Sequence, residues 1–265
     1  MKLAFIDTET TGLEPGSRVI EVAIIVTDIG GEIIDTFETL INPEMPIPPS
    51  VTSVNNITDA MVADAPILSD AMSLLWSRIP TDAVMVAHYA PFDVGMLNYA
   101  SQRAGIAIDQ GRPVIDTFAM AKSNGATKTN SLDALVEYYG IQRRGTAHRA
   151  MCDVQAMMDY YWLVANTTTI ASFSKPWVEA GANYHYVLPE DLSAELATLP
   201  ILVRDGGRLS FDYLDAQGKS STRAITPHGW YGRGENLYVT GWCHMRNDQR
   251  SFRGDRITRV VNDND

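Results

Sequence analysis

The sequence predicts an α/β domain, in which helices flank a mixed β-sheet, followed by a small β-rich domain. Three observations support this order. Residues 2–41 are rich in apolar and β-branched residues, residues 67–165 alternate short apolar segments with helical periodicity, and residues 200–262 show short apolar alternations between glycine-rich turns. A strand-rich start followed by alternating strands and helices is typical of a mixed sheet with helices on its faces.

The amino-terminal segment predicts an antiparallel meander of three strands. Residues 2–7 are mostly apolar and end in a carboxylate, and residues 18–28 are mostly apolar and β-branched. Gly30 and Gly31 lead into a similar segment at 33–41. Two strands that are joined by a glycine-rich turn form a hairpin, so we expect the three strands to pair in sequence order.

Residues 43–165 predict alternating helices and strands. Prolines interrupt regular structure over 43–49, and short helical pieces follow to about Met61. Apolar periodicity then predicts strands at 83–87 and 114–115, and helices at 67–78, 91–104, about 131–139 and about 149–165.

The remaining residues change in character. Residues 166–199 are irregular and contain prolines, so we expect a connector with one or two short helices. After it, residues 209–213 and 237–240 alternate apolar and polar side chains, as strands with one buried face do. We therefore divide the chain into three parts, namely 1–166, 167–199 and 200–265.

Composition and charge argue against several classes of protein. No apolar run approaches the length that spans a bilayer, and Asp7 comes before any signal-peptide core, so we expect no membrane partner. The two cysteines, Cys152 and Cys243, are far apart in sequence, which fits a reduced, cytoplasmic protein. The net charge of −11 argues against a protein that coats nucleic acid, although residues 200–265 carry ten basic and eight acidic residues.

Three segments stand out as candidates for chemistry, namely residues 7–13, 88–93 and 148–153. Asp7 and Glu9 are two positions apart on a predicted strand, so their side chains point to the same side. Four carboxylates that meet in one pocket would repel one another and raise each other's pKa. Two divalent cations remove that repulsion, and a set of oxygen ligands suits Mg²⁺ or Mn²⁺. Two such ions about 4 Å apart hold the attacking and leaving oxygens of an in-line phosphoryl displacement.

Taken in order, the three segments resemble the three motifs of the DEDDh family of 3′→5′ exonucleases, over residues 1 to about 165. Residues 56–66 resemble the exodeoxyribonuclease X branch of that family in particular. The resemblance implies a ribonuclease H-like fold and two Mg²⁺ or Mn²⁺ ions, held by Asp7, Glu9, Asp93 and Asp153. It also implies that His148, on the loop before the last helix of this part, is the general base that takes a proton from the attacking water.

The same resemblance implies contacts with the substrate, which it assigns to Thr8, Thr10, Thr11, Gly12, Leu13, His88, Tyr89 and Phe92. Leu13 would wedge against a base. The family usually has asparagine where Tyr89 stands, and a tyrosine there either stacks on a base or changes which substrates fit. Plain structural readings stand beside these roles: acids at strand ends and helix starts, a locally hydrogen-bonded His88, a surface-loop His148, and Leu13 and Phe92 as core residues.

Residues 200–262 resemble a WYL domain, a small β-barrel module of bacterial and phage-related regulators. The run from Arg246 to Ile257 carries the resemblance best, whereas the tryptophan-tyrosine-leucine triplet is only partly kept in residues 236–239. The resemblance implies binding of nucleic acid or a nucleotide-like ligand, for which arginine forks are suited. The candidates are Arg246, Arg250, Arg253 and Arg256, and the alternative is that they form a solvated or ion-paired face.

These expectations combine into a metal-dependent 3′→5′ exonuclease that releases nucleoside 5′-monophosphates from DNA, preferentially from single strands. An exoribonuclease or oligonucleotide-trimming enzyme is the nearest alternative, since nothing in the motifs selects the sugar. A regulator that senses nucleic acid or nucleotides ranks third, because such a protein is expected to have lost part of the acidic set. The expected partner is the 3′ end of DNA, with RNA and a homodimer left open.

Overall fold

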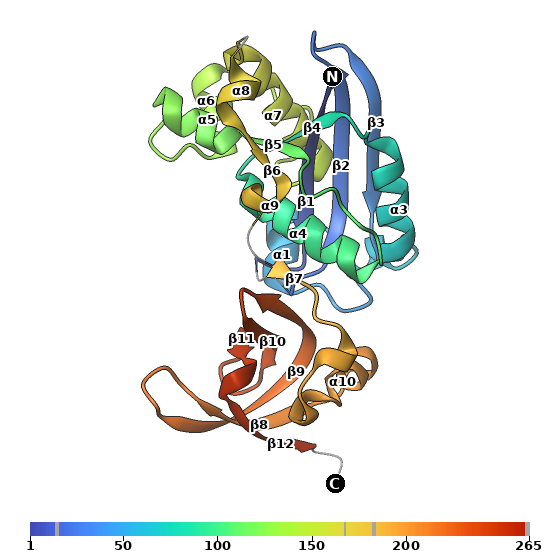
Figure 1. Cartoon of the computed structure of the whole chain (residues 1–265), viewed down its shortest axis with the longest axis vertical. Helices are drawn as coiled ribbons and strands as arrows, with labels where there is room; N and C mark the ends of the chain where they lie inside the picture. Colours follow the sequence, from blue (N-terminus) through green and yellow to red (C-terminus); the bar gives the residue numbers. More distant parts are fainter. Residues whose placement is uncertain (14–15, 167, 182–183, 263–265) are drawn as a thin grey trace. The chain divides into compact units, whose positions relative to one another are not determined.

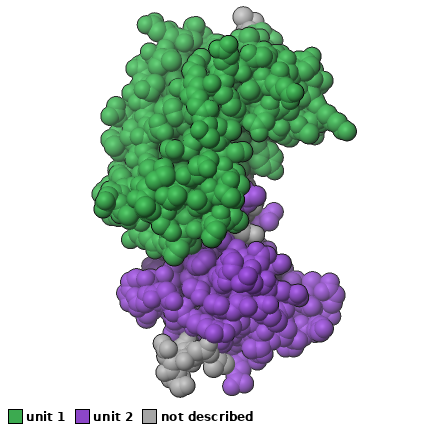
Figure 2. Space-filling view, turned by 180° about the vertical axis from the view of Figure 1, so that it is seen from behind, with its two compact units in different colours: residues 1–12, 18–182 green, residues 13–17, 183–265 purple. Residues whose placement is uncertain are grey.

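The computed structural model describes residues 1–13, 16–166, 168–181 and 184–262. The chain divides into two compact units, which Figure 2 colours separately. The first unit comprises Met1–Gly12 and Arg18–Ala182, and the second comprises Leu13–Ser17 and Asn183–Asp265. Among the described residues, no helix combines the length and the apolar character that crossing a membrane requires.

The first unit is built on a six-stranded mixed sheet (Figure 1). Its strands lie in the order β3-β2-β1-β4-β5-β6, with bounds β1 Lys2–Thr10, β2 Val19–Asp28, β3 Ile33–Leu40, β4 Ala83–Ala87, β5 Pro113–Asp116 and β6 Ser174–Pro176. Strands β1 to β3 pair antiparallel as a meander, whereas β4 runs parallel to β1 and β5 runs parallel to β4. The predicted mixed sheet is therefore confirmed, and β1 lies inside it with a neighbour on each side.

Helices cover both faces of this sheet. They are α1 Pro49–Asn55, α2 Asp59–Val62, α3 Leu68–Arg78, α4 Ala90–Arg103, α5 Thr117–Asn124, α6 Leu132–Tyr139, α7 Ala150–Val164, α8 Thr169–Phe173 and α9 Trp177–Ala180. On one face, Ile6 of β1 belongs to the same core cluster as Leu97 of α4. On the other face, Phe5 clusters with Val154 of α7. Because neighbouring strand residues point to opposite faces, odd-numbered residues of β1 face α7.

Three features differ from the sequence-based expectation. Strand β1 does not end at Asp7 but continues to Thr10, which pairs with Val19 of β2. Helix α5 is additional, and its N-cap is the Asp116 side chain, which accepts a hydrogen bond from Phe118 N at 3.0 Å. Strand β6 is also additional, because its three residues are too few to show a period and form a strand only by pairing with β5.

The second unit contains an antiparallel sheet, which confirms the predicted β-rich domain. Its strands lie in the order β11-β10-β9-β8-β12, with bounds β8 Leu209–Leu214, β9 Ser220–Arg233, β10 Asn236–Cys243, β11 Asp248–Arg253 and β12 Ile257–Asn262, and the short β7 Tyr184–His185 pairs with β9. Phe211, Trp230 and Phe252 lie in its core. Helix α10 Leu199–Asp205 and the short 3-10 helices η1 Pro189–Asp191, η2 Ala194–Leu196 and η3 Gly254–Arg256 complete the unit.

Residues 167–199 contain elements of both units: α8, β6 and α9 belong to the first, and β7, η1 and η2 to the second. The second unit also includes Leu13–Ser17, from the connection between β1 and β2. Gly16 packs closely there, because a Cβ atom added to it would lie 2.5 Å from Cγ2 of Thr240. A glycine is therefore required at this position of the connection.

Candidate active site

Three of the four predicted acids, Glu9, Asp93 and Asp153, lie close to the fourth, Asp7. Asp7 lies on β1, and its pKa is raised well above the usual range, first by burial and then by the negative charges of Asp93, Asp153, Glu9 and Glu21. Asp93 lies in the first turn of α4 and Asp153 in the first turn of α7, so the acids reach Asp7 from both faces of the sheet. In the metal-free protein this cluster therefore consists of carboxylates that destabilise the charged form of Asp7.

Glu9 follows Asp7 on the face of β1 that is covered by α7. Burial raises the pKa of Glu9 to about 8, against a hydrogen bond from Asn55 that lowers it. Asn55 is buried at the end of α1, donates from Nδ2 to Oε2 of Glu9 at 3.2 Å, and accepts at Oδ1 from Ile57 N at 3.0 Å. Asn55 therefore orients Glu9, a role that the sequence did not reveal.

Asp93 of α4 is held by hydrogen bonds from Thr8 of β1. The backbone N and the Oγ1 of Thr8 both donate to Oδ1 of Asp93, at 3.0 Å and 2.7 Å. Burial raises the pKa of Asp93 to about 7, while these two hydrogen bonds lower it. Because the Thr8 side chain is buried and already bonded to Asp93, Thr8 positions an acid rather than offering a free hydroxyl to a substrate.

Asp153 and His148 lie together at the start of α7. The backbone N of His148, in a left-handed conformation with φ of 59°, donates to Oδ2 of Asp153 at 3.0 Å. Ligand atoms of Glu9, His148 and Asp153 all lie within 4.8 Å of one another. The guanidinium of Arg143 pairs with Oδ1 of Asp153 and also with Asp133. The imidazole of His148 is exposed beside these acids.

A fifth acid, Glu21, fixes the beginning of α7. Glu21 is fully buried on β2, directly opposite Glu9. Its carboxylate accepts hydrogen bonds from Nε of Arg149 at 3.0 Å and 3.1 Å, and from Ala150 N at 2.9 Å. The only sequence signal for Glu21 was a single acid inside an apolar strand.

The second motif is anchored from within the fold. Nδ1 of His88 lies 2.9 Å from Oγ1 of Thr117, and its Nε2 lies 3.1 Å from the carbonyl oxygen of Asn130. Burial lowers the pKa of His88. Nε2 of His88 faces a carbonyl oxygen and therefore donates to Asn130, whereas Oγ1 of Thr117, beside Nδ1, also donates to the carbonyl oxygen of Ala87 at 3.2 Å. These bonds favour the structural reading of His88, as a link between β4 and the segment before α6.

The other predicted substrate contacts fall into two groups. Oγ1 of Thr10 donates to the carbonyl oxygen of Gly12 at 2.5 Å, and Oγ1 of Thr11 accepts from Arg18 N at 2.9 Å, so both threonines fold the end of β1. Phe92 packs against the core cluster on the α4 face. Leu13 and Tyr89, in contrast, are 85% and 54% exposed.

Of the four arginines predicted to contact a ligand, Arg246, Arg250, Arg253 and Arg256, two take part in local ion pairs. Arg250 lies 3.2 Å from Asp248, and Nε of Arg253 donates to Asp255 at 2.8 Å. These contacts match the ion-paired alternative for this face. Arg246 is exposed, and Arg256 is half-buried in η3.

The carboxylate cluster fits hard divalent cations on two observations. Its donors are oxygens, which Mg²⁺ and Mn²⁺ prefer. Its negative charge is in excess, since burial raises the pKa of both Asp7 and Asp93, and the neighbouring carboxylates raise the pKa of Asp7 further. Arg143, which pairs with Asp153, already brings one positive charge to this edge of the cluster.

Comparison with known proteins gives two family matches. Residues 4–161 match the model of the RNase T family, described as exonuclease, and residues 195–261 match that of the WYL domain. The chain is 38% identical over 167 residues to a DNA polymerase III subunit epsilon-like protein of Rhodobacter capsulatus, covering 60% of this chain and 23% of that protein. It is 36% identical over 177 residues to the DNA polymerase III subunit epsilon of Treponema pallidum, covering 64% and 76%.

Among solved structures, the chain resembles exonuclease X in complex with 5′ overhanging duplex DNA. The sequence identity is 27% and the TM-score 0.50, and the match covers 64% of this chain and 98% of that chain. The chain thus spans nearly the whole of that structure, but only about a quarter of the Rhodobacter protein.

Proposed function

The chain belongs to the RNase T exonuclease family, whose model matches residues 4–161, and on this premise we propose that it is a metal-dependent 3′→5′ exonuclease of DNA. The observation that carries the proposal is the convergence of Asp93, Asp153 and Glu9 on Asp7, with the exposed His148 beside them. An acidic pocket of this kind suits the hydrolysis of an acidic polymer once cations neutralise it.

In this proposal, Asp7, Glu9, Asp93 and Asp153 hold two Mg²⁺ or Mn²⁺ ions. When bound, the ions supply charge neutralisation and stabilise the attacking and leaving oxygens of the displacement. The chain itself positions these acids through Thr8 and Asn55, and keeps the loop of His148 in place through the hydrogen bond to Asp153.

His148 acts as the general base. Its exposed imidazole accepts a proton from the water that attacks the terminal phosphorus, and an imidazole suits this task because it exchanges protons near neutral pH. The new P–O bond forms as the bond to the 3′-oxygen of the next nucleotide breaks. The products are a nucleoside 5′-monophosphate and a strand with a new 3′-hydroxyl.

We assign DNA as the substrate because the related structure of exonuclease X contains duplex DNA with a 5′ overhang. The single-stranded 3′ end is the preferred form in this proposal. None of the roles proposed above involves the 2′ position of the sugar, so an exoribonuclease is the alternative that the experiment below has to separate.

The second unit adds a nucleic-acid contact in this proposal. Its match to the WYL domain and the arginines at 246, 250, 253 and 256 support the assignment, although Arg250 and Arg253 are already paired with acids. A basic module that is tethered to a nuclease raises the local concentration of strand at the active site.

The deciding experiment is the digestion of end-labelled DNA and RNA of matched sequence by the full chain. Mg²⁺ or Mn²⁺ is present in one arm and replaced by a chelator in the other, and the Asp7→Asn variant is the control. We expect 5′-labelled DNA to shorten stepwise from the 3′ end only with metal and only with the wild-type chain. Internal cuts, or digestion in the chelator, would overturn the proposal, and faster digestion of RNA would select the exoribonuclease.

A further inference from the structure

Tyr89 has a backbone conformation that tyrosine rarely adopts. It immediately precedes α4 with φ of 63° and ψ of 54°, in the left-handed region. A side chain with a Cβ atom is strained there, and asparagine is among the residues that tolerate it best. The chain therefore keeps an aromatic side chain where a smaller polar one would be less strained.

The strained turn is held by a single carboxylate at the end of β5. Oδ1 of Asp116 accepts hydrogen bonds from the backbone N of Tyr89 at 3.0 Å, of Ala90 at 3.3 Å and of Phe118 at 3.0 Å. One oxygen thus fixes the turn together with the first residues of α4 and α5. Strained residues persist where the surrounding structure determines their conformation in this way, and they concentrate at functional sites.

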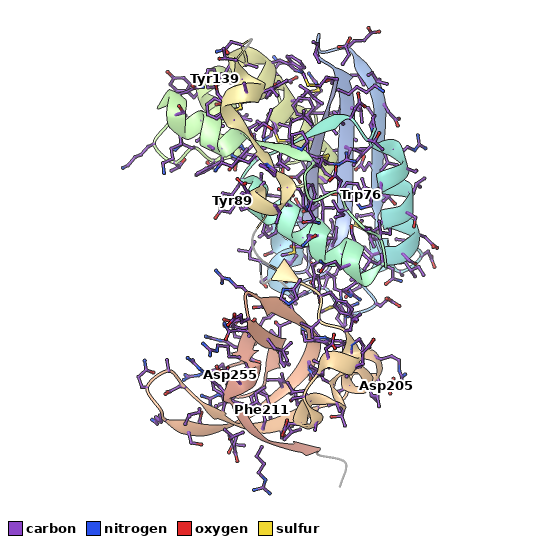
Figure 3. All side chains as sticks on the ribbon, in the orientation of Figure 1. Trp76, Tyr89, Tyr139, Asp205, Phe211 and Asp255 are labelled. Carbon is purple, nitrogen blue, oxygen red and sulfur yellow. The ribbon has the colours of Figure 1, made fainter. Side chains whose placement is uncertain are left out.

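The ring of Tyr89 contributes little to the core. It is 54% exposed, and Figure 3 labels it among the side chains of the first unit. Its ring centroid lies 5.5 Å from that of Phe118, at an interplanar angle of 77°. Phe118 in turn packs on the half-buried His88, with ring centroids 5.9 Å apart. The exposed ring of Tyr89 thus packs on Phe118, and Phe118 packs on the ring of His88.

Tyr89 also immediately precedes the first turn of α4, which carries Asp93. The carbonyl oxygen of Tyr89 accepts a hydrogen bond from Phe92 N at 3.0 Å, and Asp93 follows as the next residue. Tyr89 is thus the N-cap residue of α4, four positions before the proposed metal ligand Asp93. A rigid, exposed aromatic ring beside a phosphodiester site offers a flat apolar surface of the kind on which an unpaired base stacks.

We propose that Tyr89 stacks on an unpaired base near the 3′ end of the substrate and so selects single-stranded ends, with Phe118 as the residue that positions its ring. The inference rests on the proposed nuclease function and names a specificity-determining residue for it. Stacking on an aromatic side chain requires a base that is not enclosed in a duplex, so the ring favours frayed or single-stranded ends over blunt ones.

The test uses the full chain with the variants Tyr89→Asn and Tyr89→Phe. Tyr89→Asn removes the ring and relieves the backbone, so we expect its melting temperature to rise while KM for single-stranded DNA increases about tenfold, the effect of losing one stacked base. Tyr89→Phe keeps the ring and should retain most of the affinity. A merely structural role for Tyr89 predicts instead that Tyr89→Asn lowers the melting temperature and kcat together.

A second measurement separates stacking from other effects. A single abasic position is moved along the strand, one nucleotide at a time, from the 3′ end. In the wild-type chain, one position should raise KM by about the same factor as Tyr89→Asn does, and the variant should be insensitive to the missing base there. An equal penalty in both chains, or a Tyr89→Phe chain that behaves like Tyr89→Asn, would overturn the inference.

Phe118→Leu tests the supporting residue. It should raise KM by a smaller factor than Tyr89→Asn with kcat little affected, and it should add nothing in the Tyr89→Asn background. An additive effect would remove Phe118 from the proposal. The failure of the nuclease assignment looks different from all these outcomes, since the wild-type chain would then not digest DNA with metal at all.

Discussion

Arg149 binds the fully buried carboxylate of Glu21 with two nitrogens, across 128 positions of sequence. The pair joins β2 of the central sheet to the residue immediately before α7. His148 precedes Arg149, and Asp153 lies in the first turn that follows. The ion pair therefore fixes, from outside the cluster, the segment that carries both the proposed general base and one proposed metal ligand.

Glu21→Gln should weaken this anchor and reduce activity with it. We expect the free energy of unfolding to fall by about 3 kcal/mol, the lower end of the range for a broken buried ion pair, because Arg149 is 30% exposed and partly hydrated. Chemical denaturation measures the stability, and digestion of labelled DNA measures the activity. Glu32→Gln, at an exposed position in the turn between β2 and β3, is the control and should change both quantities little. Wild-type stability and turnover in Glu21→Gln would remove the anchoring role.

Divalent metal should stabilise the folded chain. Because the ion binds the folded state, Mg²⁺ or Mn²⁺ at about 100 times its Kd should add about 2.7 kcal/mol to the free energy of unfolding. Asp7→Asn should cancel this gain and lower kcat by about 100-fold or more, yet the metal-free variant should melt higher than metal-free wild type, because the mutual repulsion is reduced. Differential scanning fluorimetry across a metal titration checks each point. A melting temperature that does not change across the metal titration would contradict the metal assignment.

The metal-free chain should lose stability as the pH rises. Burial raises the pKa of Glu9 to about 8 and of Asp93 to about 7, whereas unfolded carboxyls titrate near pH 4. Between these values the folded state binds more protons than the unfolded state, so the free energy of unfolding decreases from about pH 4 to about pH 8.

Denaturation in a chelator over that pH range measures the slope. Glu9→Gln removes one titrating group and should flatten it, while the exposed Asp64→Asn should leave it unchanged. Identical slopes in wild type and Glu9→Gln would show that the Glu9 carboxyl is not perturbed.

Arg143 should compete with metal for Asp153. Its guanidinium pairs with Oδ1 of Asp153, so Arg143→Gln frees a ligand oxygen and removes a nearby positive charge. We expect the Mg²⁺ concentration for half-maximal stabilisation to fall by about 2- to 10-fold. Arg144 pairs with Asp159 at 2.9 Å and serves as the matched control, since Arg144→Gln should leave this midpoint unchanged. A higher midpoint in Arg143→Gln would mean that Arg143 orients Asp153 for the metal.

The arginines of the second unit should differ in their contribution to nucleic-acid affinity. Arg250 and Arg253 are already paired with acids, so the Arg246→Gln/Arg256→Gln double variant should reduce the salt dependence of single-strand binding more than the Arg250→Gln/Arg253→Gln variant does. Each lost phosphate contact lowers the slope of log K against log salt by about 0.7. Fluorescence anisotropy over a salt series measures it, with Arg259→Gln as the control. Unchanged slopes in both double variants would leave these arginines as a solvated face.

The sequence predicts those parts of the site that follow from local geometry. Asp7 and Glu9 share one face of β1 because strand residues alternate, and α7 starts after His148 as the spacing to Asp153 requires. The pairing of Arg149 with Glu21 was not predictable, because it depends on packing between distant segments. The same holds for Asp116, whose one oxygen serves three backbone donors, and for Asn55.

The threonines show the reverse case. A motif identifies Thr8, Thr10 and Thr11 as near the chemistry, and the structure places them close to it. Their hydroxyls nevertheless bond to the protein itself, to Asp93, Gly12 and Arg18. A motif gives the neighbourhood of a side chain, whereas the hydrogen bonds that it forms depend on the whole fold.

The close packing of Gly16 against Thr240 has a consequence for how this chain can be dissected or recombined. The second unit is discontinuous in sequence, because it includes Leu13–Ser17 from the connection between β1 and β2. Residues 183–265 on their own would lack the segment Leu13–Ser17 that packs with them. Conversely, a chain without residues 183–265 would leave Gly16 without its contact with Thr240. A bulky replacement of Gly16 would therefore clash with Thr240 and destabilise the second unit.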